Sequence, residues 1–134
     1  MPYAATPFCR ALFRSMSPDS TTDPATLGDL VTACSRVIDF VRGASRSDLD
    51  HNQQMLSACC YQIAVIGEAV KRLSVTLRTR HPEVPWKDIA GMRDRLIHGY
   101  DAVDADELWK TAAVDVPALL EQVRRIQAID FEQR

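Results

Sequence analysis

Apolar residues recur at three- and four-residue spacing over much of the chain, which is the pattern of amphipathic helices. The first such stretch opens at Asp23-Pro24, where an acidic residue precedes a proline suited to the first helical position, and Gly43 is placed to end it. Its apolar stripe consists of Leu27, Leu30, Val31, Cys34, Val37, Ile38 and Val41. We therefore expect a helix between Asp23 and Gly43.

The strongest periodic signal runs from Asp48 to about Thr79, with apolar residues at intervals of seven. These residues are Leu49, Leu56, Ile63, Val70 and Leu77. The pattern predicts one helix of about 30 residues, or ~45 Å at 1.5 Å per residue. Gly67 lies in its middle, where glycine costs about 1 kcal/mol relative to alanine, so we expect another helix to approach closely there.

Two further helices are expected after the prolines of "HPEVP", which forbid regular helix through that link. One should run from Trp86 to Gly99. The next should open at Asp104, which forms a capping box with Glu107, and continue to about Ala128 with a kink at Pro117. No stretch alternates with period two for long enough to predict a strand.

The resulting fold class is all-α, an antiparallel up-and-down bundle of four main helices. The 134 residues suit one domain, which we place at 23–134 behind a flexible arm at 1–22, with Met16 as an alternative start. No apolar run approaches the ~20 residues that cross a bilayer, so we expect no membrane association. The four cysteines lack CxxC spacing, which favours packed, reduced thiols in a cytoplasmic protein over a zinc site or disulfides.

Charge is distributed unevenly. The net charge of −2 argues weakly against a nucleic-acid-binding protein. However, residues 78–98 carry five basic and three acidic side chains, whereas 1–77 carry seven of each and 99–134 carry four and eight. The local positive excess therefore ends at the segment "GMRDRLIHGYDAVD", which concentrates polar groups in a stretch that otherwise resembles a buried helix.

On a helix, Asp94 and His98 are four residues apart and lie on one face, so the carboxylate can accept a ring N–H and fix the tautomer of the imidazole. Arg93 is roughly 140° away from His98 around the same helix. Either its long side chain reaches around, or a second copy of the helix supplies the complementary group. By spacing alone, His98 could equally cap the helix, the arginines could form surface ion pairs, and Tyr100 could simply pack.

The segment "RDRLIHGY" resembles the R-x4-H-x-Y motif of HepT-like members of the HEPN family, with Arg93, His98 and Tyr100 on its defining positions. Asp94 falls on the polar position after the arginine. "IAVIGEAVKRLS" resembles the family's long second helix, and "VPWKDIAGMRDRLIHGYDAVDADELW" resembles its third helix and the start of its fourth. Together the resemblance covers roughly residues 25–128.

This resemblance implies a homodimeric helical bundle whose Arg/His motifs face each other across a cleft. It also implies a metal-independent endoribonuclease that needs no cofactor and acts on RNA such as tRNA or mRNA. Such proteins are commonly toxins whose antitoxin is a minimal nucleotidyltransferase, in some cases forming a larger assembly with it. The antitoxin can attach AMP to the motif tyrosine, here Tyr100.

The residue types suit that chemistry. His98 can transfer protons and Arg93 can stabilise charge on the phosphate, with Asp94 supporting the histidine and Arg95 adding a phosphate contact. From the family resemblance we expect an aromatic or apolar residue at position 101. Asp101 departs from it and adds negative charge beside the cleft. Two alternatives stay open: a non-catalytic HEPN bundle that binds a nucleotidyltransferase and is adenylylated by it, and a purely structural helical adaptor.

Overall fold

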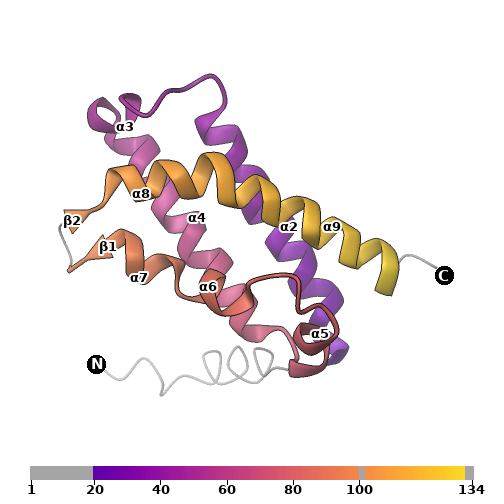
Figure 1. The fold of residues 1–134 in the computed structure, drawn as a ribbon. Coiled ribbons are helices and arrows are strands. Elements are labelled where there is room, and N and C mark those ends of the chain that lie inside the picture. Colours follow the sequence, from indigo (N-terminus) through magenta and orange to yellow (C-terminus); the bar gives the residue numbers. More distant parts are fainter. Residues whose placement is uncertain (1–19, 100–101, 132–134) are drawn as a thin grey trace, which may run out of the picture.

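The computed structural model describes residues 20–99 and 102–131, which are mostly helical (Figure 1). The elements are the 3-10 turn η2 (Ser20–Thr22), the helices α2 (Asp23–Val41), α3 (Asp48–His51), α4 (Gln53–Arg72), α5 (Val75–Arg80), α6 (Trp86–Ala90) and α7 (Met92–Leu96), the strands β1 (Ile97–His98) and β2 (Ala102–Val103), and then α8 (Ala105–Lys110), the π-helical segment η3 (Thr111–Asp115) and α9 (Val116–Asp130).

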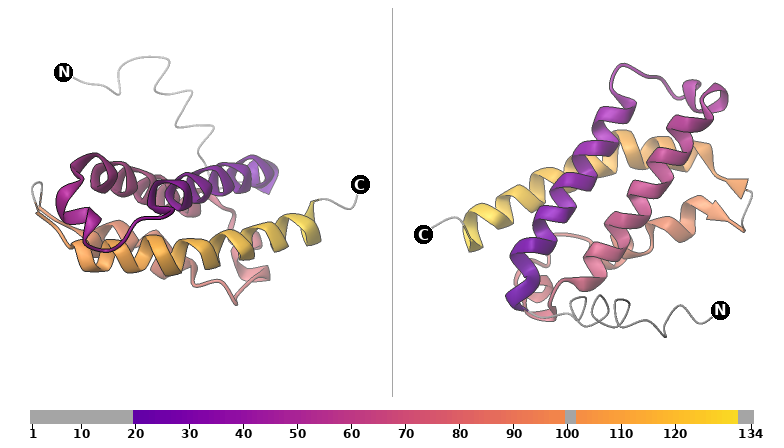
Figure 2. Two further views of the ribbon diagram at one scale, coloured as in Figure 1. Left: turned by 90° about the horizontal axis from the view of Figure 1, so that it is seen from above. Right: turned by 180° about the vertical axis from the view of Figure 1, so that it is seen from behind.

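Two layers make up the described part of the chain. Helices α2 and α4 lie side by side in one layer, and the α8–α9 stretch crosses α2 in the other, with α6 and α7 packed on α4 (Figure 2). The core lies between the layers. Three long helical stretches and one short, broken one thus take the places of the four expected helices. No helix in the described ranges is long and apolar enough to cross a bilayer.

The first expected helix is confirmed as α2. Its stripe of Leu27, Leu30, Cys34 and Val37 is completely buried, in keeping with helical periodicity. Asp23 is also buried, and its carboxylate accepts hydrogen bonds from the backbone N–H and the hydroxyl of Ser74, at 2.9 and 2.5 Å. This contact ties the start of α2 to the junction of α4 and α5.

The prediction of a single helix from Asp48 to Thr79 is wrong, because the segment is divided into α3, α4 and α5. Asn52 ends the first piece and caps the second, accepting a hydrogen bond from the N–H of Met55. Ser74 caps α5 by accepting from the N–H of Leu77. Polar caps therefore interrupt the helix where the apolar spacing continues.

The close approach expected at Gly67 is confirmed. A side-chain Cβ at this position would lie 3.3 Å from the carbonyl oxygen of Ala90, at the end of α6. Glycine therefore lets α6 pack directly against α4, and its unfavourable helix propensity is offset by this packing.

The third expected helix ends early. It breaks at Gly91 into α6 and α7, and the chain then forms the strand β1, which pairs antiparallel with β2 in the register Ile97↔Val103. The expectation of no strand is therefore wrong at this point. The backbone N–H of Asp104 donates to the carbonyl of Leu96 and closes the hairpin. Gly99, with φ +75°, supplies a left-handed backbone conformation that favours glycine.

The fourth expected helix begins as predicted, since the side chain of Asp104 accepts a hydrogen bond from the N–H of Glu107. It continues to Asp130, slightly beyond the expected end. The irregularity expected at Pro117 takes the form of a π-helical segment, Thr111–Asp115, immediately before α9. Proline lies in the first turn of α9, where its missing N–H costs least.

Candidate functional site

Helix α7 presents the charged residues of the motif to solvent. Met92 and Leu96, four residues apart, are 3% and 1% exposed and anchor one face of the helix in the core. Arg93, Asp94 and Arg95 lie between these anchors and are all exposed. By packing in the core, Met92 and Leu96 thus hold α7 so that its charged residues face solvent.

Arg93 makes one weak contact within the described part of the chain. Its Nη1 atom lies 3.6 Å from a carboxylate oxygen of Asp94, and the two side chains are 56% and 84% exposed. Ion pairs this exposed contribute under about 1 kcal/mol, so the guanidinium is available to a ligand at little cost. Arg93 also lines a hollow that includes Lys71 of α4.

His98 lies on β1 rather than on a helix, opposite Ala102 across the hairpin. Its side chain is exposed, and no hydrogen bond or ion pair joins it to Asp94 among the residues described. The helical geometry that paired Asp94 with His98 is therefore wrong, because Asp94 is on α7 and contacts Arg93 instead. The 140° separation between Arg93 and His98 no longer applies either. The role of Asp94 as a supporting residue stays a prediction without that contact.

The remaining motif positions fall outside the described residues. Tyr100 and Asp101 lie between the two strands of the hairpin in sequence. Figure 1 shows this hairpin at one end of the molecule, between α7 and α8. The predicted role of Tyr100 therefore remains a prediction from the motif.

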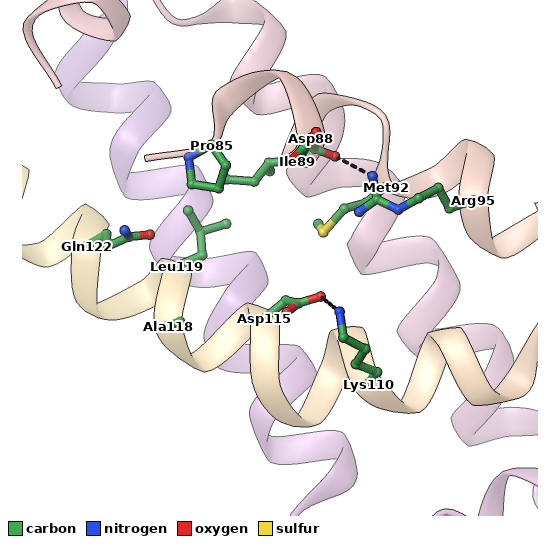
Figure 3. Close-up of a pocket in the computed structure, with 10 residues that line it drawn as sticks. All are labelled: Pro85, Asp88, Ile89, Met92, Arg95, Lys110, Asp115, Ala118, Leu119 and Gln122. Atoms are coloured by element: carbon green, nitrogen blue, oxygen red, sulfur yellow. Dashed lines mark hydrogen bonds and ion pairs between the residues drawn. The ribbon is translucent and has the colours of Figure 1, made fainter. Parts of the chain in front are cut away.

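Arg95 lies on a different side of α7 from Arg93. It lines a pocket of about 320 Å³ between α6–α7 and η3–α9, together with Lys110 and Asp115 (Figure 3). Its guanidinium donates to the carbonyl of Asp88 at 3.2 Å and lies 3.8 Å from a carboxylate oxygen of Glu107. These contacts link α7 to its neighbours. Arg95 and Arg93 line different hollows, and the phosphate contact expected of Arg95 stays a prediction.

The expectation of packed thiols is confirmed for two cysteines, while Cys60 is partly buried and Cys9 lies outside the described residues. Cys34 and Cys59 are completely buried, and burial raises the pKa of Cys34 to about 12 and that of Cys59 to about 11. A thiol is nucleophilic only as the thiolate, so neither group suits catalysis near neutral pH.

Sequence reasoning missed Lys71 and Glu68 as neighbours of Arg93. Both lie on α4 and line the same hollow as Arg93, more than twenty residues away in sequence. Nothing in local spacing could have indicated this, because the contact depends on how α7 packs on α4. Only the tertiary structure brings these side chains together.

Comparisons with known proteins agree on one family. The family described as "Ribonuclease HepT-like" matches residues 30–126. A protein of Caldanaerobacter subterraneus subsp. tengcongensis named "Putative RNase" is 39% identical over 100 residues, covering 75% of this chain and 89% of that protein. The "Probable ribonuclease HepT" of Thermococcus cleftensis is 37% identical over 93 residues, covering 69% and 84% of the two chains. No solved structure is a significant match.

Proposed function

The chain belongs to the ribonuclease HepT-like family, and on that premise we propose that it is a metal-independent endoribonuclease whose catalytic residues are Arg93 and His98. The family itself supports ribonuclease activity. Within the fold, the main support is that both side chains are exposed on adjoining elements, α7 and β1, and that neither is engaged in a strong contact with another described residue.

RNA carries its own nucleophile, the ribose 2′-OH. Removal of its proton allows the oxygen to attack the adjacent phosphorus, and the bond from phosphorus to the 5′-oxygen of the next nucleotide then breaks. That oxygen takes a proton as it leaves. The products are a 2′,3′-cyclic phosphate and a 5′-OH, and the reaction needs a proton acceptor, a proton donor and positive charge on the phosphorane-like transition state.

His98 supplies proton transfer in this scheme, since imidazole both accepts and donates protons near neutral pH. Arg93 supplies the charge. Its planar guanidinium can donate two parallel hydrogen bonds to phosphate oxygens, which positions the phosphate as well as stabilising it. Because the contact between Arg93 and Asp94 is long and exposed, a phosphate can replace it readily.

The biological setting that we propose follows the family. The chain acts in the cytoplasm as a homodimer with the two motifs facing each other across a cleft. It is the toxin of a pair whose antitoxin is a minimal nucleotidyltransferase. Transfer of AMP to Tyr100, two residues from His98 in sequence, would place a bulky anion beside the substrate phosphate and block cleavage by steric exclusion and charge repulsion.

The competing proposal is a non-catalytic bundle that only binds, and is adenylylated by, the nucleotidyltransferase. Both proposals use Tyr100, but only the ribonuclease requires Arg93 and His98 for a reaction. A test therefore has to separate cleavage from modification.

We would incubate purified protein with total RNA and with a tRNA pool in EDTA, and analyse the ends of the products. Wild type would be compared with Arg93→Ala, His98→Ala and Lys87→Ala, the last a matched control that removes an exposed cation from α6. Intact mass would establish that Tyr100 carries no AMP before the assay.

The ribonuclease proposal predicts cyclic-phosphate ends from wild type and from the Lys87 variant, and none from the other two. If unmodified wild type cleaves neither RNA pool, the binding-partner proposal replaces it. Cleavage that survives in both motif variants would mean that the activity resides elsewhere in the chain or in a contaminant.

A further inference from the structure

A hollow of about 200 Å³ lies where α4 meets the α6–α7 turn, next to Arg93. Small residues create it: Ala64 and Gly67 on α4 and Ala90 at the end of α6 line its surface. One water occupies about 30 Å³ of liquid, so the hollow has room for a few waters or one phosphate group, and less than the ~300 Å³ at which ligand pockets begin. Its size therefore fits a single phosphate group better than a whole nucleotide.

Two cations reach this hollow from different helices, Lys71 from α4 and Arg93 from α7. Each has an acidic partner on its own helix: Lys71 lies 3.3 Å from Glu68, and Arg93 lies 3.6 Å from Asp94. All four side chains are more than half exposed. Exposed pairs of this kind contribute little stability, so an anion entering the hollow can take both cations from their partners.

We propose that Lys71 is a second RNA-binding residue, and that it holds one backbone phosphate in this hollow together with Arg93. The inference rests on the proposed ribonuclease function, since it assigns a further residue to the same site. Lys71 contributes a compact point charge and Arg93 a planar fork, and these are complementary ways of contacting one phosphate. Because the two residues sit on separate helices, the subsite depends on the close packing of α6–α7 against α4 at Gly67.

A purely structural role for Lys71 makes different predictions. Lys71 lies in the last turn of α4, where a cation interacts favourably with the helix dipole, and it pairs with Glu68 three residues earlier. If this were its only role, replacing it would slightly lower the stability of the fold and leave the salt dependence of RNA binding unchanged. The number of phosphate contacts, in contrast, sets that salt dependence directly.

The test uses the full chain and a single-stranded 2′-O-methyl oligonucleotide, which cannot be cleaved because its 2′-oxygen is blocked. Binding would be measured by fluorescence anisotropy over a range of salt concentrations for wild type, Lys71→Gln, Lys71→Arg and the control Lys87→Gln. For Lys71→Gln, loss of one contact makes the negative slope of log affinity against log salt less steep by about 0.7. A roughly fivefold loss of affinity at about 50 mM salt should accordingly shrink to about twofold at 200 mM.

Lys71→Arg should bind nearly as wild type, and Lys87→Gln should match wild type in affinity and slope. Cleavage of the same sequence as unmodified RNA is measured in parallel, where Lys71→Gln should lower kcat/KM, because Lys71 shares with Arg93 the phosphate on which charge develops in the transition state. If Lys71→Gln matches wild type in affinity and slope, or if wild type does not bind the oligonucleotide, the subsite is overturned. Lys71-dependent binding without any cleavage would support the subsite and reject the ribonuclease. Cleavage by Lys71→Gln with an unchanged kcat/KM would reject the subsite and leave the ribonuclease intact.

Discussion

Replacing Asp23 by alanine should destabilise the fold more than any surface substitution. Asp23 is 2% exposed, and its two carboxylate oxygens accept hydrogen bonds from the backbone N–H and the hydroxyl of Ser74, which is itself 5% exposed. Without the carboxylate, both donors of this buried serine lose their acceptor. Hydrogen bonds to charged groups contribute about 1.5–3 kcal/mol each, and an unsatisfied buried donor has a comparable cost.

For Asp23→Ala we therefore expect the free energy of unfolding to fall by about 3–5 kcal/mol. With an m-value near 2 kcal/mol/M, the urea midpoint should drop by roughly 1.5–2.5 M. Asp23→Asn should cost less, because the amide oxygen can still accept from the backbone N–H of Ser74 while the hydroxyl loses its acceptor. Unfolding would be followed by far-ultraviolet circular dichroism.

Asp29→Ala provides the control, since Asp29 is an exposed acid on the same helix. It should change stability by less than about 0.5 kcal/mol. If Asp23→Ala costs less than about 1 kcal/mol, or no more than Asp29→Ala, the contact with Ser74 does not anchor the start of α2.

Three further predictions concern charge and packing. Arg93→Ala should abolish cleavage and leave the urea midpoint almost unchanged, whereas Arg95→Ala should lower the midpoint slightly, because Arg95 bonds neighbouring elements. Burial alone would raise the pKa of Asp130, but hydrogen bonds from His81 and Arg80 outweigh the effect of burial and lower that pKa. Since a depressed pKa contributes stability above the unfolded-state value, Asp130→Asn should be less stable than wild type at pH 7, and the difference should vanish as pH falls well below 4 in acid-unfolding curves. Gly67→Val should lower stability by about 1–3 kcal/mol through overpacking against the end of α6, and a midpoint equal to wild type would contradict the close approach.

Local patterns predicted the faces of the helices better than their ends. The apolar spacing of α2 and α4 identified residues that are buried, and the Asp104 cap began α8 where expected. The break at Ser74 was not predictable in the same way. Leu73 and Leu77 continue the apolar stripe across it, and the interruption is fixed by Asp23, which lies 51 residues earlier.

In the candidate site too, some residues can be predicted from the sequence and others only from the tertiary structure. The motif located Arg93 and His98, but helical spacing placed them on one helix because the strands of the hairpin, two residues each, are too short to show alternation. The same spacing predicts a helix end at Gly99, which instead follows β1 in the hairpin with φ +75°. Lys71 could be recognised only once α7 was packed on α4.

In the proposed mechanism, the 2′-OH of the substrate is the nucleophile, His98 transfers the protons and Arg93 stabilises the charge on the phosphate. Once one cleavage position has been mapped, we would synthesise that RNA with a single 2′-deoxynucleotide on the 5′ side of the scissile bond and assay it in EDTA. The proposed mechanism predicts that cleavage stops at that bond and continues at other positions with unmodified riboses. Cleavage at the 2′-deoxy position at the wild-type rate would contradict it, because the attacking oxygen would then have to come from water.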